Sequence, residues 1–263
     1  MSHRLILCAD DYAQSHAISA GILQLISARR LSATSVFSQS PLWPVLAREL
    51  AHADVDVGLH FNLTEPFVAG SRGLNYWLIN SQLRALQRQQ LKQRILEQID
   101  AFSHALGRLP DYIDGHQHVH ALPVVRLALT DAIAARWTDT PRPYVRAPDR
   151  LADSGDARLK GVILKACTAG FTRHAQRHHL AAPGWFAGLY SFDPATDYRA
   201  LMRRWLDRLL AYRAQGLIMC HPGLADSSPD PISATRPLEY RYLASDEFLQ
   251  DCAQQHIELA RFR

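Results

Sequence analysis

The sequence lacks several features that mark whole classes of protein. None of its apolar stretches is long enough to span a bilayer, and it contains no internal repeat, low-complexity tract or linker. It has no C-x-x-C pair, and its few cysteines are widely spaced, which argues against a disulfide framework and against a structural zinc site. It also has no basic patch with interleaved aromatic residues, so we expect no nucleic-acid partner.

The remaining composition is that of ordinary globular protein. The chain has 263 residues, of which 48% are hydrophobic and 21% charged, and a single α/β barrel commonly occupies this length. We therefore expect one domain over residues 1–263. The sequence enters its first apolar strand directly, without the pattern of a secretory leader, so we expect a cytoplasmic protein without a transmembrane segment.

Polar side chains follow four apolar stretches that have the character of buried strands. In barrels of alternating strands and helices, the carboxyl ends of the strands meet at one face, where active sites lie. Adjacent carboxylates raise each other's pKa unless a cation or a proton intervenes, so the first of these endings indicates either a metal or an ordinary helix N-cap. The other three endings favour the metal. The four endings are Asp10-Asp11 after 4–9, His60 after 54–59, His116-Gln-His118-Val-His120 after 110–115, and His221 after 216–220.

Strand-like and helix-like patterns alternate along most of the chain. Repeating β-α units predict a mostly parallel sheet with right-handed crossovers, and polar endings on several strands favour a closed barrel over an open sheet. The aromatic residues Trp185, Phe186 and Tyr190 have two interpretations, a stacking surface for a sugar or core packing. We expect helices over 15–30, 41–53, 123–136, 159–177, 198–214 and 247–260, a long helix ending at Gly107, strands at 33–37 and 143–146, and a loop over 67–80.

The polar endings together suggest a hydrolytic metal site. In an extended backbone, the alternating histidines at 116, 118 and 120 would all project to one face. A divalent cation held by one carboxylate and two imidazoles, with other positions open to water, is a hydrolytic arrangement. The second carboxylate of Asp10-Asp11 would then be free to act as general base, with His221 as general acid. Chemistry alone leads to metal-assisted hydrolysis of an unspecified bond.

Four motifs carry a resemblance to one known family. Cys8-Ala-Asp-Asp-Tyr12 resembles its N-A-D-D-F opening, and Gly58-Leu-His-Phe-Asn-Leu-Thr-Glu65 resembles its G-L-H-x-N-L-T-E-G segment. Asp114-Gly-His-Gln-His-Val-His120 is similar to D-S-H-x-H-x-H, and Cys220-His-Pro-Gly223 is similar to C-H-P-G. The motifs occur in the family's order and span most of the chain. The sequence thus resembles the YdjC-like carbohydrate deacetylases, which include chitooligosaccharide and hopanoid-associated deacetylases.

This resemblance implies a fold, a reaction and a set of site residues. The fold would be an irregular (β/α) barrel, similar to a TIM barrel, with the metal site at the carboxyl ends of the strands. The reaction would be hydrolysis of an N-acetyl group from an amino sugar, with magnesium or zinc as cofactor, and a homodimer is plausible. By motif position, the metal ligands would be Asp11, His60 and His116, the general base Asp10, and the groups near the acetyl would be His118 and His221, with His221 protonating the departing amine.

The sequence departs from the family pattern at three places. Cys8 replaces Asn, Tyr12-Ala13 replaces Phe-Gly, and Pro66 replaces a Gly, which gives the loop above the substrate a different path. A further candidate substrate-binding residue is Arg146, at the end of its own short strand. It would contact a substrate hydroxyl or phosphate, or the base carboxylate, and a surface ion pair is the other interpretation.

Three functions are compatible with these residues. The first is a metal-dependent deacetylase acting on an N-acetylglucosamine-type unit in an oligosaccharide or glycoconjugate. The second keeps the metal and changes the bond to a phosphoester or a cyclic amide, since rims of histidine and aspartate serve those reactions too. The third is a sugar-binding protein that retains the pocket and has lost catalysis.

Overall fold

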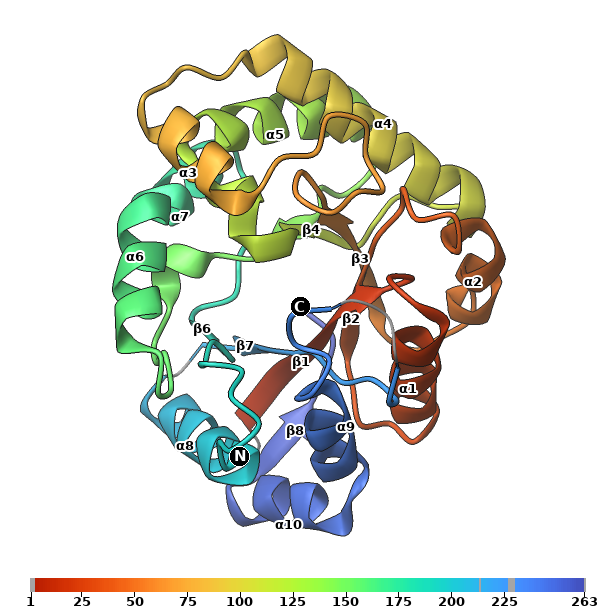
Figure 1. Cartoon of the computed structure of the whole chain (residues 1–263), viewed down its shortest axis with the longest axis vertical. Coiled ribbons are helices and arrows are strands. Elements are labelled where there is room, and N and C mark those ends of the chain that lie inside the picture. The colour runs from red at the N-terminus through yellow and green to blue at the C-terminus, as the bar shows by residue number, and fades with distance from the viewer. Residues whose placement is uncertain (1–2, 213, 227–229, 263) are drawn as a thin grey trace.

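The structure is an irregular barrel with helices on its outside (Figure 1). It is a computed structural model that describes residues 3–212, 214–226 and 230–262. Its eight strands pair in parallel in the order β5-β4-β3-β2-β1-β7-β6, and β8 pairs with the first residues of β1, which confirms the predicted fold. The strands are β1 (His3–Tyr12), β2 (Ala33–Val36), β3 (Asp56–Phe61), β4 (Tyr112–Gly115), β5 (Tyr144–Val145), β6 (Phe186–Ala187), β7 (Gly216–Cys220) and β8 (Ile257–Leu259).

Helices follow the strands and cover the sheet from outside, as Figure 1 shows. Two of them begin or end as the sequence requires: Ser15 caps α1 by accepting a hydrogen bond from the amide of Ile18, and α4 stops at Gly107, whose φ is 79°. The helices are α1 (His16–Ser27), α2 (Trp43–Leu50), α3 (Leu74–Gln82), α4 (Arg88–Leu106), α5 (Pro123–Arg136), α6 (Arg158–Thr168), α7 (Phe171–Arg177), α8 (Tyr198–Ala211), α9 (Arg236–Ala244) and α10 (Asp246–Gln254), with 3₁₀ turns η1 (His116–Ala121) and η2 (Pro148–Arg150).

The strands are buried on both faces, as the near-continuous apolar character of their sequences predicts. Between the edge strands β5 and β6, the described residues form only an isolated bridge, Leu151 to Phe186, so the barrel wall is thinnest there. Inside the barrel, Tyr112 of β4 crosses toward β1. A side chain at Gly58 would place its Cβ 2.3 Å from the Tyr112 ring, so glycine is required at that position.

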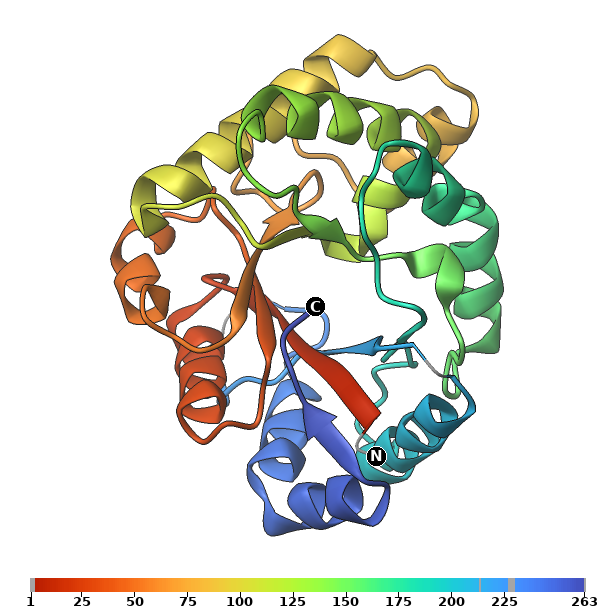
Figure 2. The ribbon, with the colours of Figure 1, turned by 180° about the vertical axis from the view of Figure 1, so that it is seen from behind.

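The last described residues close the end of the barrel at which the strands begin. Asp56, the first residue of β3, accepts hydrogen bonds from the amide of Phe262 and from the guanidinium of Arg261. The Phe262 ring stacks on Tyr144, at the start of β5. In Figure 2 this segment runs from β8 to the centre of the barrel. The opposite end, where the strands finish, remains available for a site.

Three local predictions are wrong, and one helix was not predicted. The expected loop over 67–80 contains α3, and the helix expected over 159–177 breaks before Gly170, whose φ of 79° ends one helix and starts the next. The last predicted helix stops at Gln254, because 257–259 joins the sheet as β8. The helix at 236–244 was not predicted. Among the described residues, no helix is long and apolar enough to cross a membrane.

Candidate active site

The carboxylates of Asp10 and Asp11 face the same cavity although they are neighbours on a strand. Successive side chains of a regular strand point to opposite faces. Here the backbone of Asp11 is left-handed, with φ of 70°, and the pairing of β1 with β2 shifts between Ala9 and Tyr12. Such bulges redirect side chains at active sites. Both aspartates consequently line a cavity of about 480 Å³ at the carboxyl end of the barrel.

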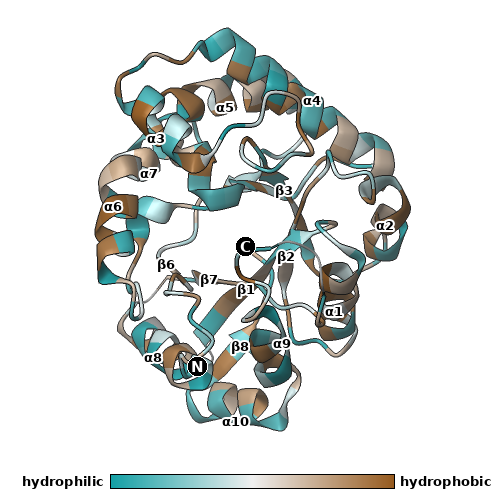
Figure 3. Cartoon of the chain, viewed as in Figure 1, coloured by the Kyte–Doolittle hydropathy of each residue, from teal (hydrophilic) through white to brown (hydrophobic). Residues whose placement is uncertain are grey.

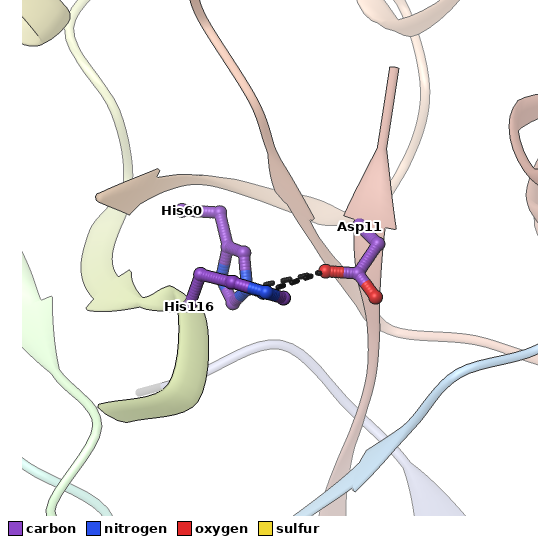
Figure 4. A group of neighbouring side chains, drawn as sticks. All are labelled: Asp11, His60 and His116. Atoms are coloured by element: carbon purple, nitrogen blue, oxygen red, sulfur yellow. Dashed lines mark ion pairs between the residues drawn. The ribbon is translucent and has the colours of Figure 1, made fainter. Parts of the chain in front are cut away.

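Asp11, His60 and His116 converge on one point (Figure 4). They come from β1, from β3 and from the first residue after β4. Asp11 Oδ1 lies 3.4 Å from His60 Nε2 and 3.2 Å from His116 Nδ1, and one ligand atom from each residue lies within 4.8 Å of the other two. The structure therefore brings together the three residues that the sequence suggested as metal ligands.

The surroundings of this group fit a metal ion. Asp11 Oδ1 is buried and has no hydrogen-bond partner, whereas Oδ2 accepts from Arg236 at 2.7 Å. His60 Nδ1 lies 2.7 Å from Asp114 Oδ1, so this nitrogen keeps a proton, and Nε2 is the ring nitrogen that faces Asp11 Oδ1. A carboxylate behind a ligating histidine is the usual arrangement in metal sites. One carboxylate oxygen and two imidazole nitrogens are therefore free to bind a divalent cation.

Without a cation, protons balance the charge of this group. Burial lowers the pKa of His60, but Asp114 and Asp10 outweigh it and raise that pKa to about 10. Burial likewise opposes protonation of His116, but the neighbouring carboxylates of Asp11 and Glu65 raise its pKa overall. Burial raises the pKa of Asp11, yet Arg236 and the two rings hold it well below the usual value. A bound divalent ion would displace these imidazole protons.

Asp10, which borders the cavity, also belongs to a second, buried cluster with its own counterion. The guanidinium of Arg146 donates to both oxygens of Asp10 at 2.6 Å and lies 2.5 Å from Asp114 Oδ2. Cys8 Sγ also lies near it, at 3.2 Å. The oxygen and sulfur ligands of this cluster thus surround an arginine instead of an ion. Burial opposes ionisation of Asp10, but Arg146 holds the pKa of Asp10 below its ordinary value.

Arg146 does not occupy the place expected of a substrate-binding residue. It is completely buried and is absent from the cavity lining, so of the interpretations offered by the sequence the structure supports contact with the carboxylate of Asp10. The sugar-stacking interpretation of Trp185, Phe186 and Tyr190 is also unsupported, because all three rings are buried in the core.

The histidines after β4 do not project to one face. The segment turns as η1, and Gln117 and His118 have positive φ values of 51° and 61°, so the extended backbone expected there is wrong. His118 lines the cavity with its Nδ1 unpaired, and burial, followed by Arg146, lowers its pKa well below the usual value. His120 instead points inward and its Nε2 contacts the carbonyl of Arg146 at 2.9 Å.

His221 lines the same cavity, beside Asp10. Its Nε2 lies 3.8 Å from Asp10 Oδ2, and Phe192 packs edge-on against its ring. Its backbone amide donates to Glu239 Oε2 at 2.6 Å, and the same carboxylate accepts from Tyr190 at 2.7 Å. Glu239 is fully buried on the first turn of α9, where it fixes the backbone that carries His221.

Three residues that shape the site escaped the sequence analysis as site residues: Asp114, Arg236 and Glu239. Asp114 lies inside a recognised motif, two residues before His116, but its carboxylate points back into the barrel. The other two form an R-x-x-E pair at the start of α9, which reaches both Asp11 and His221. The only available signal was that charged spacing itself, on a segment that does not directly follow a strand.

Comparison with known proteins finds relatives that align over nearly the whole chain. Human carbohydrate deacetylase is 26% identical over 97% of this chain and 89% of its own length. The chitooligosaccharide deacetylase of Proteus mirabilis (strain HI4320) is 24% identical over 100% of this chain and 99% of its own. Both alignments therefore extend over the whole barrel.

Solved structures share the fold. A protein of Enterococcus faecalis V583, provisionally named for cellobiose-phosphate cleavage, superposes with a TM-score of 0.76 at 18% identity, covering 99% of this chain and 98% of its own. A family 4 acetyl xylan esterase from Clostridium thermocellum, in complex with cobalt, has a TM-score of 0.50 at 10% identity, covering 98% and 87%. The model of the YdjC-like protein family matches residues 4–254, which include every site residue described above. This chain is therefore a member of the YdjC-like family.

Proposed function

We propose that the protein is a metal-dependent hydrolase that removes the N-acetyl group from an N-acetylglucosamine-type amino sugar in an oligosaccharide or glycoconjugate. The observation that carries the proposal is the unpaired, buried Oδ1 of Asp11 facing two imidazole nitrogens, with Asp10 and His221 in the same cavity. The names of the relatives, carbohydrate deacetylase and chitooligosaccharide deacetylase, support an acetylated sugar as substrate.

Asp11, His60 and His116 would hold the metal, which we propose to be magnesium or zinc. Such an ion polarises a carbonyl and lowers the pKa of water. Arg236 and Asp114 hold two of the ligands in position. Arg236 contacts Oδ2 of Asp11 and leaves Oδ1 to the metal, and Asp114 contacts Nδ1 of His60 and leaves Nε2 to the metal. The ligand set thus needs little rearrangement on metal binding.

Asp10 is the proposed general base. Arg146 holds both of its oxygens from the barrel interior, so the carboxylate is ionised and fixed in direction while it borders the cavity. A general base must lie within hydrogen-bond reach of the proton that it removes. In this role Asp10 takes the proton from the attacking water, and Arg146 acts only through the position of Asp10.

His221 is the proposed general acid. Its Nε2 lies beside Asp10 and its backbone is fixed by Glu239, so it is placed to donate a proton to the amine as the C–N bond breaks. His118 is neutral and its unpaired Nδ1 belongs to the cavity wall. We assign it the binding of the acetyl group or of an adjacent sugar hydroxyl.

The experiment is a measurement of acetate release by the purified protein, first stripped with a chelator and then loaded with zinc or magnesium. The substrates are N-acetylglucosamine, chitobiose, longer chitooligosaccharides and a lipid-linked N-acetylglucosamine. We expect release that requires the metal. If protein shown to hold metal released no acetate from any of these substrates, the deacetylase proposal would be refuted, and hydrolysis of another bond or a binding role would be favoured.

A further inference from the structure

Helix α6 turns its apolar stripe outward. Leu159, Val162 and Ile163 recur at helical spacing, and the stripe of a surface helix normally faces the core. Here these side chains are 73%, 65% and 46% exposed, whereas Gly161 and Thr168 face the barrel. The helix therefore presents apolar side chains to solvent.

Helix α3 extends this surface. Its residues Tyr76 and Ile79, with Leu83 just after the helix, also follow helical spacing and are between 46% and 72% exposed. Gln82 donates to the carbonyl of Cys167 at 3.0 Å and joins the end of α3 to α6. Both helices lie along one side of the barrel in Figure 1, and Figure 3 shows hydrophobic segments on both. We call these six side chains (76, 79, 83, 159, 162 and 163) the α3–α6 face.

The face is continuous with the active-site cavity. Leu74 and Leu78 of α3, and Ile163 and Leu164 of α6, line that cavity together with its polar residues. Ile163 belongs to both the face and the lining. A polar sugar gains little from such a wall, whereas an apolar group attached to the sugar could leave the cavity along it without entering water.

The chain around the face carries positive charge only. Residues 66–96 contain no Asp or Glu but five basic residues, of which Arg88 is paired with Asp131 of α5. Residues 157–192 also contain no Asp or Glu, and again hold five basic residues. The two sets are Arg72, Arg84, Arg88, Lys92 and Arg94, and Arg158, Lys160, Lys165, Arg173 and Arg177.

We propose that the α3–α6 face rests on an anionic lipid surface, and that the amino sugar entering the cavity is attached to an apolar chain anchored there. The inference rests on the proposed function for its sugar part. Exposed apolar side chains flanked by Lys and Arg are the signature of helices that lie in a lipid interface. The charge also argues against a second copy as the occupant, because a two-fold contact would bring two positive surfaces together.

The test is co-sedimentation of the full chain with vesicles made of equal parts phosphatidylcholine and phosphatidylglycerol, and with vesicles of phosphatidylcholine alone. We expect binding to the anionic vesicles that weakens as salt is added. The variant Leu159→Ser/Val162→Ser should bind at least about tenfold more weakly, since each side chain loses its apolar burial. The matched control, Val45→Ser/Leu249→Ser, removes two apolar residues that are 68% and 47% exposed on α2 and α10, and should bind as the parent does.

Acetate release from a soluble chitooligosaccharide, measured on the same proteins, separates this inference from the proposed function. Leu159 and Val162 do not line the cavity, so that rate should be unchanged in the face variant. Absence of vesicle binding, equal loss in the control pair, or self-association abolished by the face variant would each overturn the lipid proposal while leaving deacetylation intact. Vesicle binding by a metal-loaded protein that releases no acetate from any substrate would instead refute the proposed function.

Discussion

Asp10 and Asp11 are neighbours of the same residue type at the end of one strand, yet they occupy opposite electrostatic situations. Arg146 donates hydrogen bonds to both carboxylate oxygens of Asp10. The counterion of Asp10 is thus part of the chain and is buried inside the barrel. Arg236 donates a hydrogen bond to Oδ2 of Asp11, whereas Oδ1 has no hydrogen-bond donor. A fold that leaves one buried carboxylate oxygen unpaired retains a strong acceptor, which suits a cation from outside.

The largest expected effect separates the roles of the two aspartates. Asp10→Asn should lower acetate release by about 10²- to 10⁴-fold, because the general base is lost, while metal binding persists. Asp11→Asn should remove the metal as well as the activity. Metal content by mass spectrometry, beside acetate release, distinguishes the two. An Asp10→Asn protein that folds normally and retains turnover would disprove the base assignment.

The next effect concerns the sealed counterion. Arg146→Met should lower the free energy of unfolding by about 3–5 kcal/mol, because the buried carboxylates of Asp10 and Asp114 lose the guanidinium that they share. Arg136→Met is the matched control, since Arg136 pairs with Asp100 at the surface and should cost less than about 1 kcal/mol. Chemical unfolding followed by fluorescence measures both. Equal, small losses would show that Arg146 is dispensable for the interior.

A smaller effect probes the partner of Asp11. Arg236→Gln should weaken metal affinity by about 10- to 100-fold, because Asp11 loses the group that holds its orientation. Arg199→Gln removes a salt-bridged arginine of α8 that contacts Glu247 and Asp251, away from the cavity, and should leave the affinity unchanged. Titration calorimetry with zinc provides the comparison. An unaltered affinity in Arg236→Gln would mean that Asp11 needs no such support.

The smallest expected effect is a difference in thiol reactivity between the interior and the cavity wall. Burial raises the pKa of the Cys8 and Cys220 thiols, and it raises the pKa of the Cys252 thiol to about 12. Cys167, in contrast, is partly exposed and lines the cavity. Since the thiolate is the reactive form, one thiol per folded chain should react rapidly with a disulfide reagent. Cys167→Ser should abolish that fast phase, and a fast phase that survives the substitution would place the reactive thiol elsewhere.

Sequence analysis predicted the site residues that follow the end of an apolar strand, and it missed those that do not. Asp10, Asp11, His60 and His221 each come at or near the end of an apolar strand, and parallel strands bring such ends together. Whether each residue performs the role assigned to it is what the variants above test. Asp114 was hidden by the same rule, because a carboxylate inside a strand is read as a structural residue.

The rest depended on backbone conformations that a sequence does not display. Asp11, Gln117 and His118 all have positive φ, which is uncommon outside glycine, and these torsions set where the aspartates and the histidines point. Ala13 also has φ of 70°, at the position where the related motif carries glycine. For α3, the local composition of Gly, Asn and Trp suggested a loop, and packing against α5 and η1 decided otherwise.

The contact between Asp11 and Arg236 spans 225 residues, and it has a consequence for how the protein is made. While the chain emerges from the ribosome, β1 can pair at first only with β2, because its other partners, β7 and β8, are synthesised near the end. Contacts between such distant segments form late, after a large loss of chain entropy. The metal-binding corner is consequently completed by the last part of the barrel to be translated, and a nascent chain that stops before α9 carries both aspartates but not the arginine that holds Asp11.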